Sequence, residues 1–276
     1  MKKKINTIDL ISLGLPIFAA IGIILRSIAF LTAFDSSVGY FSDSTVITYL
    51  DRAFFAIAIL FGIAVSILIK KNEISIEVSP TNLWSTFASL ILGFVFAIFG
   101  LLFLLMTISS ATVLTYVVYA GAFISAVYYL YEGFSPIRVG TLSAARALVV
   151  IISIIGLIAI VFVENFDFYV ALNNSEKTFA MFIFVIASIF TIQKLKFVAG
   201  NPSPRFYLCT SYITAFLGAY FSIPGIIANC TGVVDSPKYL LYYLLALGLA
   251  IYASIDFIGR IKLSKLAEIP TVPTEQ

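Results

Sequence analysis

Long apolar stretches alternate with short polar segments along almost the whole chain. A helix that crosses a bilayer needs about 20 mainly apolar residues. The pattern therefore predicts an all-α bundle of eight transmembrane helices. It forms one membrane domain over residues 1–265, followed by a flexible cytoplasmic tail over residues 266–276. The eight predicted spans are residues 9–33, 47–69, 81–106, 111–131, 141–163, 177–195, 206–228 and 238–259.

Lysine and arginine are distributed unevenly between alternate polar segments. With the N-terminus placed in the cytoplasm, the inner segments hold thirteen of the 17 residues, and the outer segments hold Arg52, Lys177 and Lys238. The remaining one, Arg26, lies within the first span. Because cytoplasmic loops are enriched in Lys and Arg, the asymmetry predicts that both ends of the chain are cytoplasmic. The asymmetry also supports the weakly apolar sixth span, since without that span the basic C-terminal residues would lie outside.

Composition agrees with a membrane protein and excludes several functions. The chain is 61% apolar and 11% charged, whereas typical soluble domains are about 45–50% apolar and about 25% charged. The net charge of +3 is too small and too scattered to predict nucleic-acid binding. Histidine is absent, which removes the commonest general base and the commonest metal ligand. We therefore expect no enzymatic activity, no metal site and no cofactor.

The two cysteines, Cys209 and Cys230, flank the seventh predicted span. Along a helix they are roughly 30 Å apart, whereas a disulfide needs Cα atoms within about 7 Å. The spacing therefore predicts two unbridged thiols. The short basic N-terminus and the short loops favour a multi-pass protein of a bacterial inner membrane or plasma membrane.

Arg26 is the most informative charged residue, because charges inside a span are costly and usually face protein or water. It lies roughly 10 Å below the outer end of its span and shares a helical face with Gly22 and Ala29. Asp51 begins the second span on the same side, so an ion pair across the first helical hairpin is predicted. Three roles stay open for Arg26: a structural pair, an anchor for an anionic group, or a side chain that extends to the outer interface.

Pro224 and Gly225 fall in the outer half of the seventh span. A broken membrane helix exposes backbone groups that often bind an ion or a substrate, although a simple kink is the alternative. Ser222 and Asn229 lie on the same helical face as Gly225. The sequence thus predicts a substrate-binding site in the outer half of the bundle, formed by Arg26, Asp51, Ser222 and Asn229.

Other acidic residues are interpreted as structural. The outer loops are acidic, and this follows from the enrichment of basic residues on the inner side. On the inner side, Glu132 and Arg146 flank one short loop and are placed to form an ion pair. Asp256 and Arg260 are spaced as a helical pair. The acidic residues assigned to outer loops are Asp35, Asp43, Glu164, Asp167, Glu176 and Asp235.

Three functions are compatible with these patterns. The first is a small transporter or solute-binding membrane component that holds a polar or anionic solute near Arg26. The second is a noncatalytic subunit or regulator that packs against another membrane protein. The third and least favoured is an intramembrane lipid-modifying enzyme, which without histidine would depend on a carboxylate such as Glu132 or Asp256. The lipid bilayer is the expected surrounding in each case.

Overall fold

The computed structural model describes residues 7–36, 39–42, 45–68, 83–110, 112–134, 143–167, 170, 174–200 and 203–267. Within these ranges, eight helices are long and apolar enough to cross a membrane, which confirms the predicted helical bundle. The predicted orientation, with both ends cytoplasmic, stays a prediction. Residues 268–276 of the predicted tail lie outside the described residues, and its first two residues continue the last helix.

Each predicted span corresponds to one long helix, and two short strands and a 3-10 turn complete the described elements. The sixth helix begins at Ser175 rather than at residue 177, so that Glu176 and Lys177 belong to its first turn. The elements are α1 (Thr7–Ala33), β1 (Phe34–Asp35), β2 (Tyr40–Phe41), α2 (Val46–Leu68), α3 (Leu83–Thr107), η2 (Ile108–Ser110), α4 (Val113–Phe134), α5 (Ala144–Asn165), α6 (Ser175–Val198), α7 (Pro204–Cys230) and α8 (Pro237–Ala267).

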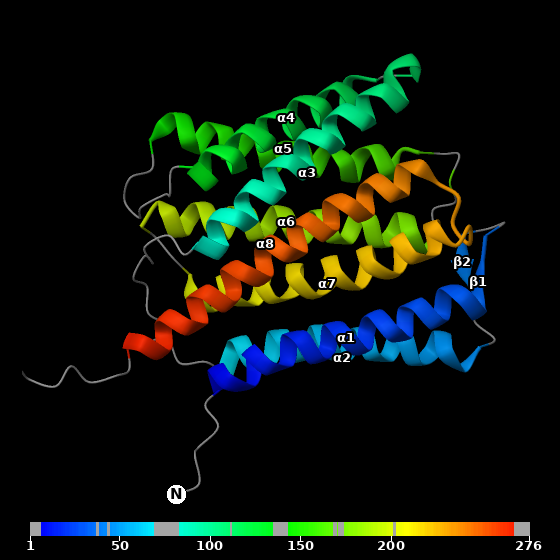
Figure 1. The fold of residues 1–276 in the computed structure, drawn as a ribbon, viewed down its shortest axis with the longest axis horizontal. Coiled ribbons are helices and arrows are strands. Elements are labelled where there is room, and N and C mark those ends of the chain that lie inside the picture. The colour runs from blue at the N-terminus through cyan, green and yellow to red at the C-terminus, as the bar shows by residue number, and fades with distance from the viewer. Residues whose placement is uncertain are drawn as a thin grey trace, which may run out of the picture.

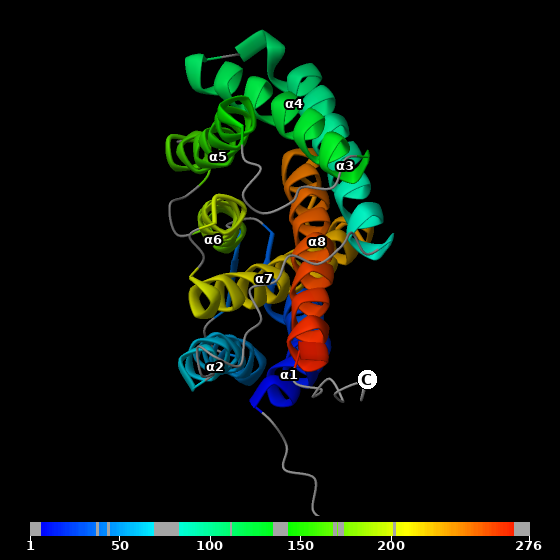
Figure 2. The same cartoon turned by 90° about the vertical axis from the view of Figure 1, so that its left-hand side faces the viewer.

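Helices α7 and α8 form the centre of the bundle and are the most buried of the spans. The α1–α2 pair packs on one side of the bundle, mainly against α7 (Figure 1). On the other side α3 packs against α8, and α3, α4, α5 and α6 follow one another in order (Figure 2). The α1–α2 pair is therefore a separate layer whose contacts with the rest of the molecule run largely through α7.

Small residues bring neighbouring helices close together, as expected where lipid supplies no hydrophobic drive for association. Gly121 of α4 lies against Gly156 of α5, and a Cβ atom on either would overlap the other backbone. A Cβ atom on Gly218 of α7 would lie 2.7 Å from the carbonyl oxygen of Ala246 and from Cβ of Ala250, both on α8. These contacts fix the spacing of α4 to α5 and of α7 to α8.

A small antiparallel β-hairpin lies between α1 and α2 at one end of the bundle, called here the hairpin end; it is the half that the sequence assigns to the outer side. Phe34 pairs with Phe41, and Asp35 pairs with Tyr40. Gly39 lies in the turn with φ of 74°, a conformation that favours glycine. Its carbonyl oxygen accepts a 3.0 Å hydrogen bond from the backbone N–H of Ser175, so the hairpin is joined to the start of α6.

Candidate functional site

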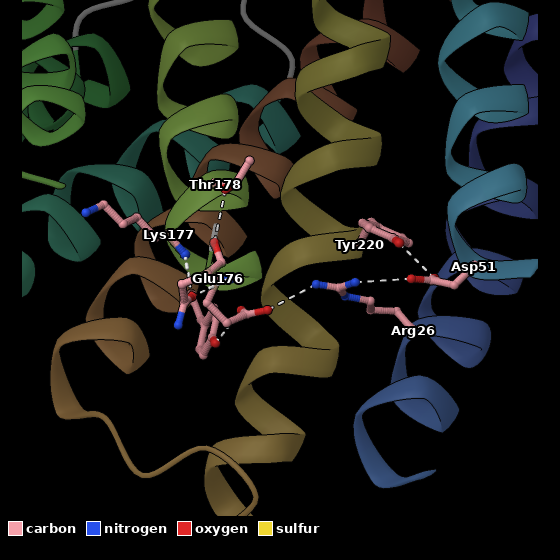
Figure 3. Close-up of polar contacts among 8 residues, drawn as sticks. Arg26, Asp51, Glu176, Lys177, Thr178 and Tyr220 are labelled. Carbon is pink, nitrogen blue, oxygen red and sulfur yellow. Dashed lines mark hydrogen bonds and ion pairs between the residues drawn. The ribbon is translucent and has the colours of Figure 1, made fainter. Parts of the chain in front are cut away.

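Arg26 lies in the bundle at the hairpin end, with only 3% of its surface exposed. One of its terminal nitrogens donates to Asp51 Oδ2 on α2 at 3.1 Å, which confirms the predicted pair across α1 and α2. The other terminal nitrogen donates to Glu176 Oε1 on α6 at 3.0 Å (Figure 3). The sequence pattern does not predict this second ion pair. Arg26 is thus shared between a carboxylate of its own layer and one on the far side of α7.

Each carboxylate has a second partner, which is a tyrosine from one of the two central helices. The hydroxyl of Tyr220 on α7 donates to Asp51 Oδ1 at 2.7 Å. The hydroxyl of Tyr243 on α8 donates to Glu176 Oε2 at 2.6 Å. We call Arg26, Asp51, Glu176, Tyr220 and Tyr243 the Arg26 cluster. It is the point at which α1, α2, α6, α7 and α8 meet.

Aromatic rings enclose the guanidinium group of Arg26. Its central carbon lies 4.0 Å from the ring centre of Phe41 on β2 and 4.5 Å from that of Phe179 on α6. Phe30 and Tyr220 lie at 5.1 and 5.6 Å. A cation over an aromatic face is attracted to it, more strongly where water is excluded. The β-hairpin thus contributes Phe41 to the rings that enclose the guanidinium of Arg26.

The Arg26 cluster holds one cation and two carboxylates, so it carries one excess negative charge when both are ionised. Lys177 is the next residue along α6, but its Nζ donates to the backbone carbonyl oxygens of Asp167 at 2.7 Å and Val170 at 3.2 Å. It therefore does not balance Glu176. Burying an unbalanced charge is costly, and the excess charge favours uptake of a proton or a cation.

The start of α6 is fixed by Asn174, the residue that precedes the helix. Its side-chain oxygen accepts from the backbone N–H groups of Glu176 at 2.8 Å and Lys177 at 3.0 Å, as an N-terminal cap does. Glu176 is only 1% exposed. Its sequence assignment to an acidic outer loop was wrong, because the apolar pattern does not reveal a polar first turn that lies inside the bundle.

Ser222 and Asn229, the other two predicted site residues, lie apart from the ion pairs of Arg26. Ser222 is fully buried on α7, and its Oγ has no hydrogen-bond partner within the described residues. The side-chain nitrogen of Asn229 donates to the backbone carbonyl of Ser236 at 3.3 Å, in the connection from α7 to α8. The α-helix continues through Pro224 to Cys230, so the helix break considered for the seventh span is not present.

A second buried group of charges lies between α5 and α8. Glu164 is fully buried, and one of its oxygens accepts from Lys238 at 2.9 Å and from Tyr242 at 2.8 Å. Lys238 also pairs with Asp167 at 2.6 Å. The assignment of Glu164 to an acidic loop was therefore also wrong: it belongs to the last turn of α5 and is paired inside the bundle.

Polar groups also meet at the opposite end of the bundle. Glu132 forms an ion pair with Lys194 rather than with Arg146, and it accepts from Tyr252 through both oxygens at 3.1 Å. Arg146 donates instead to the hydroxyl of Tyr131 at 2.9 Å. The predicted Glu132–Arg146 pair was wrong because Lys194, from the more distant α6, occupies the position beside Glu132. A hydrogen bond also joins Tyr207 of α7 to Asp256 of α8.

The eight spans and their buried ion pairs define a multi-pass helical membrane protein. Among the residues that the structure describes, no three His, Cys, Asp or Glu side chains are grouped so as to hold a metal ion. No protein-family model, curated protein or solved structure matches this chain.

Proposed function

We propose that the protein is a small proton-coupled transporter of a polar solute, in which the Arg26 cluster takes up and releases the coupling proton. The observation that carries this proposal is the excess of one carboxylate over the single cation in a fully buried cluster. Intramembrane ionisable residues generally mark ion paths and proton relays. The proposal assigns no catalytic chemistry to the protein.

Protonation of Glu176 would change how the α1–α2 layer is held to the rest of the bundle, because Arg26 forms two different ion pairs. The pair with Asp51 lies within the α1–α2 layer, whereas the pair with Glu176 joins that layer to α6. A proton on Glu176 leaves Arg26 balanced by Asp51 and removes the ionic link between the layers. The α1–α2 layer is then held by its packing against α7, by the Tyr220–Asp51 hydrogen bond and by the hydrogen bond from Ser175 to Gly39, so its attachment to α6 is weakened. Alternating access commonly uses one group of helices moving against another.

This role differs from the anion anchor that the sequence left open for Arg26. Both terminal nitrogens of Arg26 already donate to carboxylates, and aromatic rings cover the guanidinium. An anionic solute approaching it would face an excess negative charge. We therefore assign Arg26 to coupling and propose a neutral or cationic polar solute.

The proposal is tested by proton movement into proteoliposomes that contain the purified protein and a trapped pH indicator. A potassium diffusion potential, negative inside, drives the reaction, and pools of amino acids, sugars or polyamines are added outside. We expect one pool to accelerate acidification of the lumen. Glu176→Gln should abolish that acceleration, because it fixes the cluster in its neutralised state.

Asp235→Asn is the matched control, since Asp235 is an exposed acidic residue beyond the end of α7. It should retain the native rate. Native protein that acidifies the lumen no faster than empty liposomes with every pool would refute proton-coupled transport of these solutes. Equal acceleration in native protein and in Glu176→Gln would show that the Arg26 cluster is not the coupling site.

A further inference from the structure

Serine and threonine hydroxyls in several of the helices form the same type of hydrogen bond. A hydroxyl in a membrane helix commonly donates to the carbonyl oxygen four residues earlier. This satisfies the polar group within the helix and leaves it without need of water. The structure has such bonds, of 2.6 to 3.0 Å, at Ser66, Ser125, Ser153, Ser188 and Thr191.

Three serine and threonine hydroxyls on α7 differ from that pattern; a fourth hydroxyl of this helix without a partner among the described residues, that of Tyr212, belongs to a ring that lies against Gly62 of α2. Ser211, Thr214 and Ser222 are fully buried, yet none of their oxygens has a hydrogen-bond partner in the part of the chain that the structure describes. A buried polar group without a partner is costly. Because this cost recurs at three positions on one face of α7, it points to a ligand that supplies the missing hydrogen bonds.

The three hydroxyls lie on one face of α7, and that face packs on α8. They share it with Gly218 and Gly225, at steps of three and four residues. Gly218 lies against the backbone of α8, and Gly225 lies against the ring of Tyr243. We call this contact the α7–α8 seam. Gly218 is its narrowest point, with Ser211 and Thr214 on one side and Ser222 on the other.

An acidic group lies at each end of the α7–α8 seam. One turn before Ser211, the hydroxyl of Tyr207 donates to Asp256, which is half-buried and lies toward the end opposite the hairpin. Beyond Ser222 is Tyr243, whose hydroxyl donates to Glu176 in the Arg26 cluster. The buried hydroxyls therefore lie along α7 between two carboxylates near the two ends of the bundle.

We propose that the α7–α8 seam binds water molecules in two short files, one at Ser211 and Thr214 and one at Ser222, and that these files lead protons between Asp256 and Glu176. Hydroxyls both donate and accept hydrogen bonds, so each can hold water and relay a proton. Buried water generally satisfies polar groups of this kind. The proton route rests on the proposed function, whereas the binding of water does not.

The contact at Gly218 divides the two proposed files from each other. In this structure α7 and α8 touch there, so water on one side does not continue to the other. A continuous route needs these helices to separate slightly. The Gly218 contact therefore interrupts the proposed route between Asp256 and Glu176 in this structure, and proton passage requires a change in the packing of α7 against α8.

Water binding is tested by the reactivity of introduced thiols, without any transport assay. The background is full-length protein in which both native cysteines are replaced, by Cys209→Ala and Cys230→Ala. A single cysteine is introduced into it by Ser211→Cys, Thr214→Cys or Ser222→Cys, and each variant is exposed to silver ions. Thiols that remain free are then counted by maleimide labelling after unfolding. The reactive thiolate forms where water reaches the sulfur, so we expect reaction about tenfold or more faster than for Ser188→Cys, whose position is buried and bonded within its own helix.

Reaction at the three positions no faster than at Ser188→Cys would overturn the water files, whatever the transport result. The proton route is tested by the liposome assay. Thr214→Val should lower proton movement at least severalfold, whereas Thr210→Val should not, since Thr210 donates to carbonyl oxygens of its own helix at 3.0 Å. If the native protein moves protons and both variants match it, the route is wrong although the proposed function stands. If the native protein moves none, the proposed function and the route both fail, and silver reactivity alone decides the water files.

Discussion

The charge imbalance of the Arg26 cluster predicts that its basic and acidic members differ in their effect on stability. Arg26→Met keeps much of the length of the side chain but leaves Asp51 and Glu176 buried without a cation. Removing one partner of a buried ion pair costs about 3–5 kcal/mol. We expect the upper part of that range, because Arg26 is 3% exposed and two carboxylates lose their partner together.

Glu176→Gln should behave very differently although it breaks one of the same ion pairs. The loss of a hydrogen bond between charged groups costs about 1.5–3 kcal/mol. That loss is offset because the excess buried charge disappears and Asp51 still balances Arg26. We therefore expect the free energy of unfolding to remain within about 1 kcal/mol of the native value, since the penalty for a buried unpaired ion is itself several kcal/mol.

Unfolding in mixed detergent and dodecyl sulfate micelles, followed by circular dichroism, measures both variants. Arg52→Met serves as the control for loss of an arginine, because Arg52 is exposed on α2 and should change stability little. If Arg26→Met is no more destabilising than Glu176→Gln, the cluster carries no excess negative charge. Proton uptake by the cluster would then have no electrostatic driving force.

Two further predictions concern packing and topology. Gly121→Ala should cost about 1–3 kcal/mol in the same unfolding assay, because the new methyl group overlaps Gly156 on α5; Gly259→Ala, with no neighbour within 4 Å, should have no such cost. In intact cells, a membrane-impermeant maleimide should label the exposed Cys230 and not Cys209, since the two lie at opposite ends of α7. Labelling of Cys209 alone would reverse the predicted orientation.

The bundle was predictable from the sequence because hydrophobic length directly reflects the thickness of a bilayer. The eight helices agree with the eight apolar stretches, and even the weak sixth span is present. The Arg26–Asp51 pair was predictable for a related reason. The two residues lie on consecutive helices joined by a short hairpin, so their depths in the membrane fix their proximity.

The pairing of Glu176 with Arg26 could not be predicted in this way, because the two residues are 150 positions apart and α1 and α6 are not consecutive in the sequence. Hydropathy also places it outside the sixth span. One local signal was available: Asn174 is a favoured helix cap, and an acidic residue in the first turn is stabilised by the helix dipole. That signal predicts where α6 begins, but only the packing of α6 beside α7 places Glu176 against Arg26.

A purely structural role for the Arg26 cluster and a coupling role make opposite predictions for one variant. If the cluster only holds α1 and α2 against the bundle, Glu176→Gln should leave any proton movement by the folded protein unchanged. If the cluster couples transport to protons, the same variant should fold with nearly native stability and lose proton movement. Proton flux through Glu176→Gln therefore separates the two roles, and stability measured on the same preparation shows that any lost flux is not a loss of the fold.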